Sequence, residues 1–204
     1  MAKIEPGTSA LLVLDYQNYG LDPNGYWAQH APGLLERAAA PIARTERALA
    51  TARSVGLPVI HVGQAWREGH PDVNPGEPWQ VAAKEAGRTV EGTWGVEFFP
   101  PVAPLREELA VYKRCISALT GTDLDRLLRI RGIMTLVLVG GATNGAVEGT
   151  ARQAADMGYR VIVIEDCCFA MSDEEHGHSC KYALSWIGSV IGVDEFIASL
   201  GATA

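Results

Sequence analysis

The 204-residue sequence has few cysteines, no excess of basic residues and no long hydrophobic run. Its four cysteines contain no Cys-x-x-Cys pair, and the N-terminal MAKIEPGTSA lacks the charged-then-apolar pattern of a signal peptide. We therefore expect reduced, mostly buried thiols rather than a disulfide framework. Seventeen Lys and Arg against 24 Asp and Glu give a net charge of −7, and no basic patch opposes it, which argues against nucleic-acid binding. No apolar run approaches the roughly 18–20 residues that span a membrane.

The composition is that of an ordinary globular protein, with 48% hydrophobic and 20% charged residues. The length predicts a single domain over residues 1–204, large enough to bury a core without disulfides or a metal. We expect a cytoplasmic protein whose partner is a small molecule, with no nucleic acid and no membrane.

Short β-rich runs alternate with helical stretches along the chain. Residues 63–104, by contrast, are rich in Gly, Pro and Trp without clear periodicity, and we expect them to form loops around a site. The alternation predicts an α/β fold of three layers, with a mostly parallel six-stranded sheet and helices on both faces. We expect strands at 10–14, 58–62, 109–112, 134–139, 160–164 and near Val190, and helices at 33–55, 123–131, 144–157, 172–186 and 193–200.

Three polar or glycine-rich groups follow predicted strands, where ligands bind in parallel sheets. Asp15 could be a general acid or base, a metal ligand or a strand-end residue that caps a turn. Lys113 could reach solvent, but if both side chains face one crevice they should pair, and the lysine would hold Asp15 ionised. The turn Gly140–Ala146 could offer free N–H groups to an oxyanion. It lacks the Gly-Lys-Ser/Thr of a phosphate-binding loop and the spacing of a dinucleotide fingerprint.

Taken together, three segments carry a more specific signal. LLVLDYQN, VYKRCISALTGTDLDRLL and VLVGGATNGAVEGTARQAADMGYRVIVIEDCC, with GTWG at 92–95, resemble the signature blocks of the isochorismatase-like (cysteine hydrolase) superfamily over about residues 8–200. The resemblance implies a Rossmann-like fold and an Asp-Lys-Cys triad, in which Asp15 and Lys113 supply the first two members. It also implies a cis peptide bond at Gly141–Ala142 and an oxyanion hole made by the N–H groups of Ala142 and Ala146.

The position of the nucleophilic cysteine holds Ala146, whose methyl group cannot attack a carbonyl. One interpretation is an engineered, inactive variant in which Ala146 replaces a native cysteine to trap substrate. The parent would be an amidohydrolase-type enzyme, which cleaves a non-peptide C–N bond of an amide, ureide or imide. This interpretation is supported by the rest of the motif, which is intact at Asn144, Glu148 and Thr150. A second is a natural cysteine-free enzyme of the isochorismatase type, which hydrolyses a vinyl ether with Asp15 as the proton donor. A third is a non-catalytic relative that binds a ligand.

Other residues are assigned more ordinary roles. Cys115 should pack in the core, and the spacing of His176, His178 and Cys180 supplies too few ligands for a metal. The Asp-x-His that metal-dependent nicotinamidases carry after the second strand is replaced here by His61-Val62-Gly63-Gln64, so we expect no metal and no cofactor.

Specificity should come from loop aromatics, and among them we expect Tyr19, Trp66 and Trp94 to lie nearest the substrate. Gln17 and Asn18 could instead hold the Asp15 loop in place. Because relatives usually assemble, we also expect a homo-oligomer, either a dimer or a tetramer.

Overall fold

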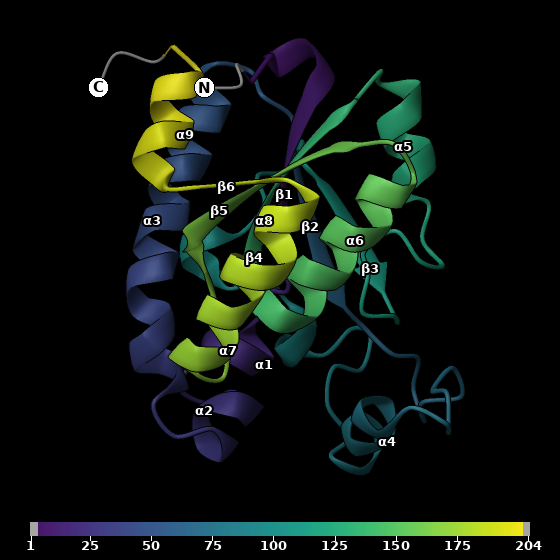
Figure 1. The fold of residues 1–204 in the computed structure, drawn as a ribbon. Helices are drawn as coiled ribbons and strands as arrows, with labels where there is room; N and C mark the ends of the chain where they lie inside the picture. Colours follow the sequence, from purple (N-terminus) through teal and green to yellow (C-terminus); the bar gives the residue numbers. More distant parts are fainter. Residues whose placement is uncertain (1–3, 202–204) are drawn as a thin grey trace.

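The computed structural model describes residues 4–201 and contains a six-stranded parallel sheet with helices on both faces (Figure 1). The strand order is β3-β2-β1-β4-β5-β6. Every pair is parallel, so the predicted three-layer α/β architecture is confirmed. The strands are β1 (Ser9–Leu14), β2 (Val59–Gln64), β3 (Leu109–Lys113), β4 (Thr135–Gly141), β5 (Arg160–Phe169) and β6 (Ser189–Ile191).

The central strands are apolar because both of their faces are covered. Successive residues of β1 pack on opposite sides: Leu12 and Leu14 join one core cluster, and Leu11 and Val13 join the other. The first cluster includes α5 (Leu124–Ile130) and α6 (Glu148–Asp156), and the second includes α3 (Leu34–Ser54) and α9 (Val193–Ser199). No helix of the described residues is long and apolar enough to cross a membrane.

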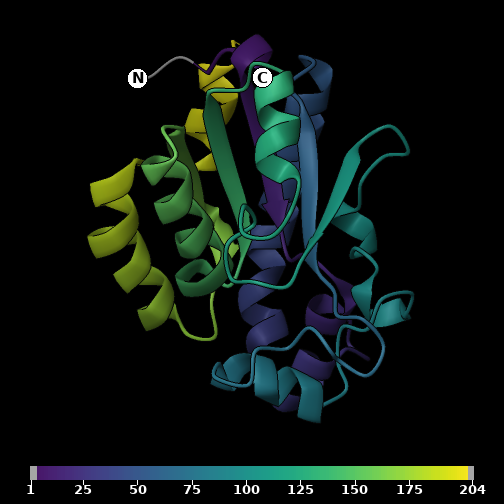
Figure 2. The same ribbon diagram turned by 90° about the vertical axis from the view of Figure 1, so that its right-hand side faces the viewer.

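The sheet reverses its winding direction between β1 and β4. The chain runs outward through β2 and β3 on one side of β1, and through β5 and β6 on the other side of β4. A crevice for ligands forms at such a switch point, beyond the carboxyl ends of the strands. Three short helices gather at this end of the sheet: α1 (Asn18–Leu21), α2 (Tyr26–His30) and α4 (Pro78–Glu85) (Figures 1 and 2).

The long segment after β2 is mostly loop, as predicted, but it is held in place by ion pairs. Arg114, the residue after β3, donates from Nε to Asp72 Oδ2 at 2.6 Å and from Nη2 to Glu91. These contacts tie two distant parts of the segment to the end of β3. Within it lie α4 and two short 3₁₀ turns, Trp94–Val96 and Pro100–Val102.

The fifth strand is longer than its apolar run indicates. We expected it to end at Ile164, with Cys167 and Cys168 following it, whereas β5 continues to Phe169 and includes both cysteines. The register against β4 shifts between Leu138 and Gly140. This irregularity accommodates the acidic Glu165-Asp166 pair, and Asp166 Oδ1 accepts a hydrogen bond from the N–H of Val193.

The last helical region is one continuous stretch in three parts: α7 (Asp173–His178), a π-helical segment (Ser179–Leu184) and α8 (Ser185–Ile187). Ser172 begins it with a capping box that includes Glu175, in agreement with the predicted start.

Candidate active site

Asp15 and Lys113 form a buried ion pair at the carboxyl end of the sheet. Asp15 directly follows β1, and its backbone has a φ of 56°, in the left-handed region that few residues other than glycine adopt. Lys113 is the last residue of β3, and its side chain extends past the end of β2 to place Nζ 2.8 Å from Asp15 Oδ2. The side chains of the lysine and the aspartate are 3% and 9% exposed. The predicted pairing is therefore present.

Lys113 does not lower the pKa of Asp15 overall, although the sequence predicts that the lysine holds this carboxylate ionised. Burial raises the pKa of Asp15 above its ordinary value, and the opposing effect of Lys113 is smaller. The other carboxylate oxygen, Oδ1, is buried and has no hydrogen-bond partner among the described residues. Lys113 thus positions the carboxyl group, while desolvation increases the affinity of that group for a proton.

The turn after β4 brings backbone atoms close to this pair. Gly140 has a φ of 144°, and a Cβ at this position would lie 2.3 Å from the carbonyl oxygen of Leu14, so glycine alone allows β4 to approach β1 here. The next peptide bond, Gly141–Ala142, is cis. A π-helical turn, Thr143–Val147, follows and leads into α6. Such turns are often found at functional sites.

The N–H groups of this turn are unequally used. Those of Gly145 and Val147 donate to the carbonyl of Ala142, at 3.0 and 3.3 Å. Within residues 4–201, the N–H of Ala142 makes no backbone or side-chain hydrogen bond. The N–H of Ala146 donates to no described residue outside the π-helical turn. Ala146 is 6% exposed.

A cavity of about 470 Å³ joins these groups, a volume suited to a small ligand. Apart from the Asp15–Lys113 pair and Arg88, its wall is largely apolar. It is lined by Asp15, Tyr19, Trp27, Gln64, Trp79, Ala82, Arg88, Lys113, Ile116, Gly141, Ala142, Gly145, Ala146 and Met171.

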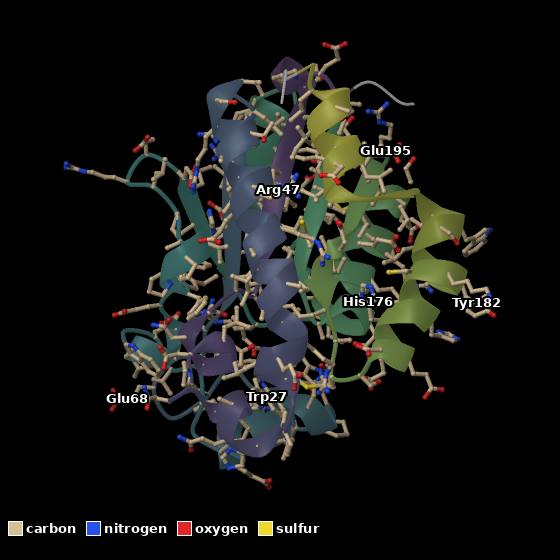
Figure 3. All side chains as sticks on the ribbon, turned by 90° about the vertical axis from the view of Figure 1, so that its left-hand side faces the viewer. Trp27, Arg47, Glu68, His176, Tyr182 and Glu195 are labelled. Carbon is tan, nitrogen blue, oxygen red and sulfur yellow. The ribbon has the colours of Figure 1, made fainter. Side chains whose placement is uncertain are left out.

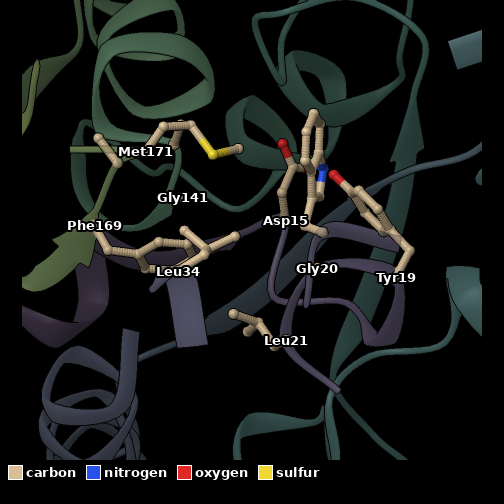
Figure 4. Close-up of a pocket in the computed structure, with 11 residues that line it drawn as sticks. Asp15, Tyr19, Gly20, Leu21, Leu34, Gly141, Phe169 and Met171 are labelled. Carbon is tan, nitrogen blue, oxygen red and sulfur yellow. The ribbon is translucent and has the colours of Figure 1, made fainter. Parts of the chain in front are cut away.

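A smaller hollow of about 40 Å³ adjoins this cavity and shares Asp15, Tyr19 and Met171 with it (Figure 4). The hydroxyl end of Tyr19 points toward Asp15 in this view, and the thioether of Met171 reaches toward the same space. Burial and the nearby Asp15 carboxylate raise the pKa of Tyr19, so its hydroxyl stays protonated and can donate a hydrogen bond.

Of the three aromatic residues expected nearest the substrate, Tyr19 lines the cavity and Trp66 and Trp94 do not. Trp66 is fully buried behind the cavity wall, because it follows β2 by only two residues and still packs in the interior of the protein. Trp94 is 45% exposed, and it contributes its carbonyl, which accepts a hydrogen bond from Asn18 Nδ2. Their places in the wall are taken by Trp27 and Trp79. Trp27 lies on α2 at this end of the molecule, far from Glu195 at the other (Figure 3).

Gln17 and Asn18 hold the Asp15 loop, as predicted. Gln17 is fully buried, and its Nε2 donates to the carbonyls of Gln64 and Val96 while its Oε1 accepts from the N–H of Gln64. These bonds attach the segment after β1 to the end of β2 and to the long loop.

His176 lies beside the candidate turn, with Nδ1 at 2.9 Å from Thr143 Oγ1. Its Nε2 lies 3.8 Å from Cys180 Sγ, and Glu165 completes a group whose ligand atoms lie within 4.8 Å of one another. The sequence spacing did not reveal Glu165, because that residue comes from β5. His178, which the spacing grouped with them, contacts the ring of Tyr182 instead.

The chain is similar in sequence and in fold to several known hydrolases. The ureidoacrylate amidohydrolase RutB of Methylobacterium radiotolerans is 31% identical over 97% of this chain and 81% of its own length. The N-carbamoylsarcosine amidase of Thermoplasma acidophilum superposes with a TM-score of 0.71 at 26% identity, covering 92% of this chain and 97% of its own. A cysteine hydrolase of Pseudomonas syringae pv. phaseolicola has the same fold, with a TM-score of 0.88 at 23% identity over 98% of this chain and 96% of its own. The isochorismatase domain model matches residues 9–195, and the chain therefore belongs to the isochorismatase family of hydrolases.

Proposed function

We propose that this fold hydrolyses a small-molecule, non-peptide C–N bond in an amide, ureide or imide when a thiol stands at position 146. With Ala146, the chain binds that substrate and does not cleave it. The observation that carries the proposal is the shared cavity, which is lined by the buried Asp15–Lys113 pair, by Ala142, whose N–H has no partner among the described residues, and by Ala146.

The reaction follows from these groups. Asp15 takes the proton of the thiol, and the thiolate attacks the carbonyl carbon. The N–H groups of Ala142 and residue 146 stabilise the resulting oxyanion. Asp15 then returns the proton to the leaving nitrogen as the C–N bond breaks and a thioester forms. Water attacks the thioester and gives a proton to Asp15, which passes it to the departing sulfur as the C–S bond breaks. The acid product (a carbamic acid from a ureide) and the thiol are released, and Asp15 is again a carboxylate.

The electrostatics of Asp15 support this sequence of proton transfers. A carboxyl group whose pKa is raised by burial accepts and returns a proton near neutral pH more readily than an exposed one. The similar ureidoacrylate amidohydrolase and N-carbamoylsarcosine amidase are named for the hydrolysis of ureide and amide substrates, which supports the same bond class here.

The direct test is the Ala146→Cys variant, assayed for ammonia release on a panel of small amides, ureides and imides. We expect activity at least about 10³-fold above that of the unchanged chain on one or more compounds, because a covalent nucleophile is restored. The double variant Ala146→Cys/Asp15→Asn is the matched negative control. A variant that folds normally but releases no ammonia across the panel would contradict the proposal.

The raised pKa of Asp15 also favours a second candidate, in which the unchanged chain hydrolyses a vinyl ether with Asp15 as a general acid. This reaction needs no thiol, so the two candidates separate cleanly. The chain with Ala146 would cleave isochorismate, and Ala146→Cys would not improve that rate. Binding of a ligand without turnover by either form would favour a non-catalytic role.

The remaining sequence-based expectations stay predictions. They are a cytoplasmic location, assembly as a dimer or tetramer, and independence from metal and cofactor. Size-exclusion chromatography with light scattering tests the assembly, and assays of Ala146→Cys with and without a chelator test the metal.

A further inference from the structure

Arg88 places a positive charge in the wall of the cavity. Its guanidinium lies 4.7 Å from the ring centroid of Trp27 and 4.9 Å from that of Tyr26, so the two rings of α2 flank it. Its Nε is buried and makes no hydrogen bond within the described part of the chain. Burial lowers the pKa of Arg88, which remains charged at neutral pH.

No carboxylate of the described residues forms an ion pair with this charge. Asp15 is the one acidic side chain among the residues that line the cavity, and it is paired with Lys113. None of the ion pairs formed by residues 4–201 includes Arg88. Arg88 is partly buried, and a partly buried cation without a counter-ion carries a desolvation cost that a bound anion would offset.

The backbone of Arg88 is held firmly, as a binding residue requires. Its N–H donates to the carbonyl of Ala83 at the end of α4, and its carbonyl accepts a hydrogen bond from His70 Nε2 at 3.1 Å. The next residue, Thr89, accepts from the N–H of Trp66 at 2.7 Å. The buried Trp66 ring also packs against Trp79, with ring centroids 5.9 Å apart. Trp66 therefore supports the wall from behind.

We propose that Arg88 binds a carboxylate of the substrate, so that the preferred ligands are amides or ureides that carry an acid group at the end away from position 146. The guanidinium offers a planar fork that matches a carboxylate. The protonated hydroxyl of Tyr19 supplies a neutral donor in the same cavity. This inference rests on the proposed function for the bond that is cleaved, but the binding of the acid group is tested separately.

The experiment uses the chain with Ala146, which should hold ligands without cleaving them. Calorimetry compares 3-ureidopropionate, N-carbamoylglycine and succinamate with their neutral methyl esters. We expect at least one acid to bind about tenfold or more tightly than its ester. Arg88→Met should remove that preference, and Arg88→Lys should keep only part of it, because the charge remains but the fork is lost. Arg106→Met is the control: it removes the same charge from an exposed residue outside the cavity and should keep the full preference.

The outcomes separate this inference from the proposed function. If Ala146→Cys cleaves nothing but the acid preference is present and depends on Arg88, the reaction is wrong and the binding inference stands. If no acid on the panel binds more tightly than its ester, the inference is overturned. A preference that persists in a folded Arg88→Met protein overturns it as well, whatever Ala146→Cys cleaves.

Discussion

Two carboxylates at opposite ends of the sheet are both largely shielded from solvent but are electrostatically opposite. The side chains of Asp15 and Glu108 are each 9% exposed. Glu108, which comes just before β3, accepts hydrogen bonds from Arg53 Nε and Nη2 at 2.8 and 2.9 Å and from the N–H of Leu105 at 2.8 Å. These bonds outweigh burial and lower the pKa of Glu108, whereas burial prevails at Asp15 and raises its pKa.

The difference shows how the fold separates stability from chemistry. Both oxygens of Glu108 have donors, so its charge is fully compensated and it can serve as a structural tie between α3 and β3. Asp15 has one donor, and its second oxygen is buried without a partner. Unsatisfied buried groups are uncommon in folded proteins, and this one belongs to a residue that lines the cavity, where a bound ligand could complete its bonding. Asp15 also lies deeper than Glu108, so the low exposure of both side chains is accompanied by opposite shifts of their pKa values.

The largest expected effect is on activity, from Asp15→Asn in the Ala146→Cys background. The amide has nearly the same shape as the carboxylate but cannot take the thiol proton, so kcat/KM should fall by about 10³-fold or more. Glu108→Gln in the same background is the matched control and should change kcat/KM by less than about threefold. Retention of a tenth of the activity by Asp15→Asn would remove the catalytic role assigned to Asp15.

The second expected effect is on stability, where the Glu108 variant, not the Asp15 variant, should show the larger loss. Glu108→Gln breaks a compensated buried pair and should lower the free energy of unfolding by about 3–4 kcal/mol in urea titrations. Asp15→Asn should lower it by less, about 1–2 kcal/mol, because removing a desolvated carboxylate relieves a burial cost that offsets part of the unpairing of the buried Lys113, whose hydrogen bond the amide oxygen can still accept. Equal losses in the two variants would mean that the contrast between the sites is not one of compensation.

The sequence predicts the sheet and its edge well because buried parallel strands leave a strong local signal. Continuous apolar runs identify β1, β2 and β4, and their carboxyl ends locate Asp15 and the turn at 140–146. The short helices α1 and α2 leave no such signal. They occupy residues 18–30, where two single turns are held by tertiary contacts rather than by periodicity.

The wall of the cavity could not be predicted for the same reason. Arg88, Trp27 and Trp79 come from irregular or short elements, and nothing in their local sequence distinguishes Trp79, which lines the cavity, from Trp66, which is buried behind it. The choice between these two aromatic residues depends on how the segment 63–104 returns to the sheet. That path is set by Arg114 and by the bonds of Trp66 to Thr89 and Glu91.

The intact motif around Ala146 also has a structural explanation. Thr150 is buried and accepts a hydrogen bond from the N–H of Ala118, and Glu148 accepts bonds from Ser179 and Arg152. These residues stabilise the start of α6 whether or not a thiol is present. The chemical signal therefore comes from the unpartnered oxygen of Asp15 and the free N–H of Ala142 more than from the surrounding motif.

The smallest expected effect concerns His61, which lies against Glu108 and whose neutral form, like that of Asp15, is favoured by burial. Burial lowers the pKa of His61 to about 4, even though its Nε2 lies 3.3 Å from Glu108 Oε2. Between pH 6.5 and 4 the unfolded chain binds a proton on this histidine and the folded chain does not, so acidification favours unfolding. The free energy of unfolding should therefore fall by about 2–3 kcal/mol across this interval from His61 alone.

Urea titrations of the unchanged chain and of His61→Gln, at intervals from pH 7 to pH 4, measure this contribution. The variant has no ring to protonate and should lose less stability over the interval. Asp15 acts in the opposite sense, because its raised pKa lets the folded state bind a proton first, and it contributes equally to both curves. The difference between the curves therefore isolates His61. Parallel curves would show that the His61 ring is protonated in the folded protein over this pH interval. In that case the Glu108 carboxylate would offset the burial cost of the charged ring.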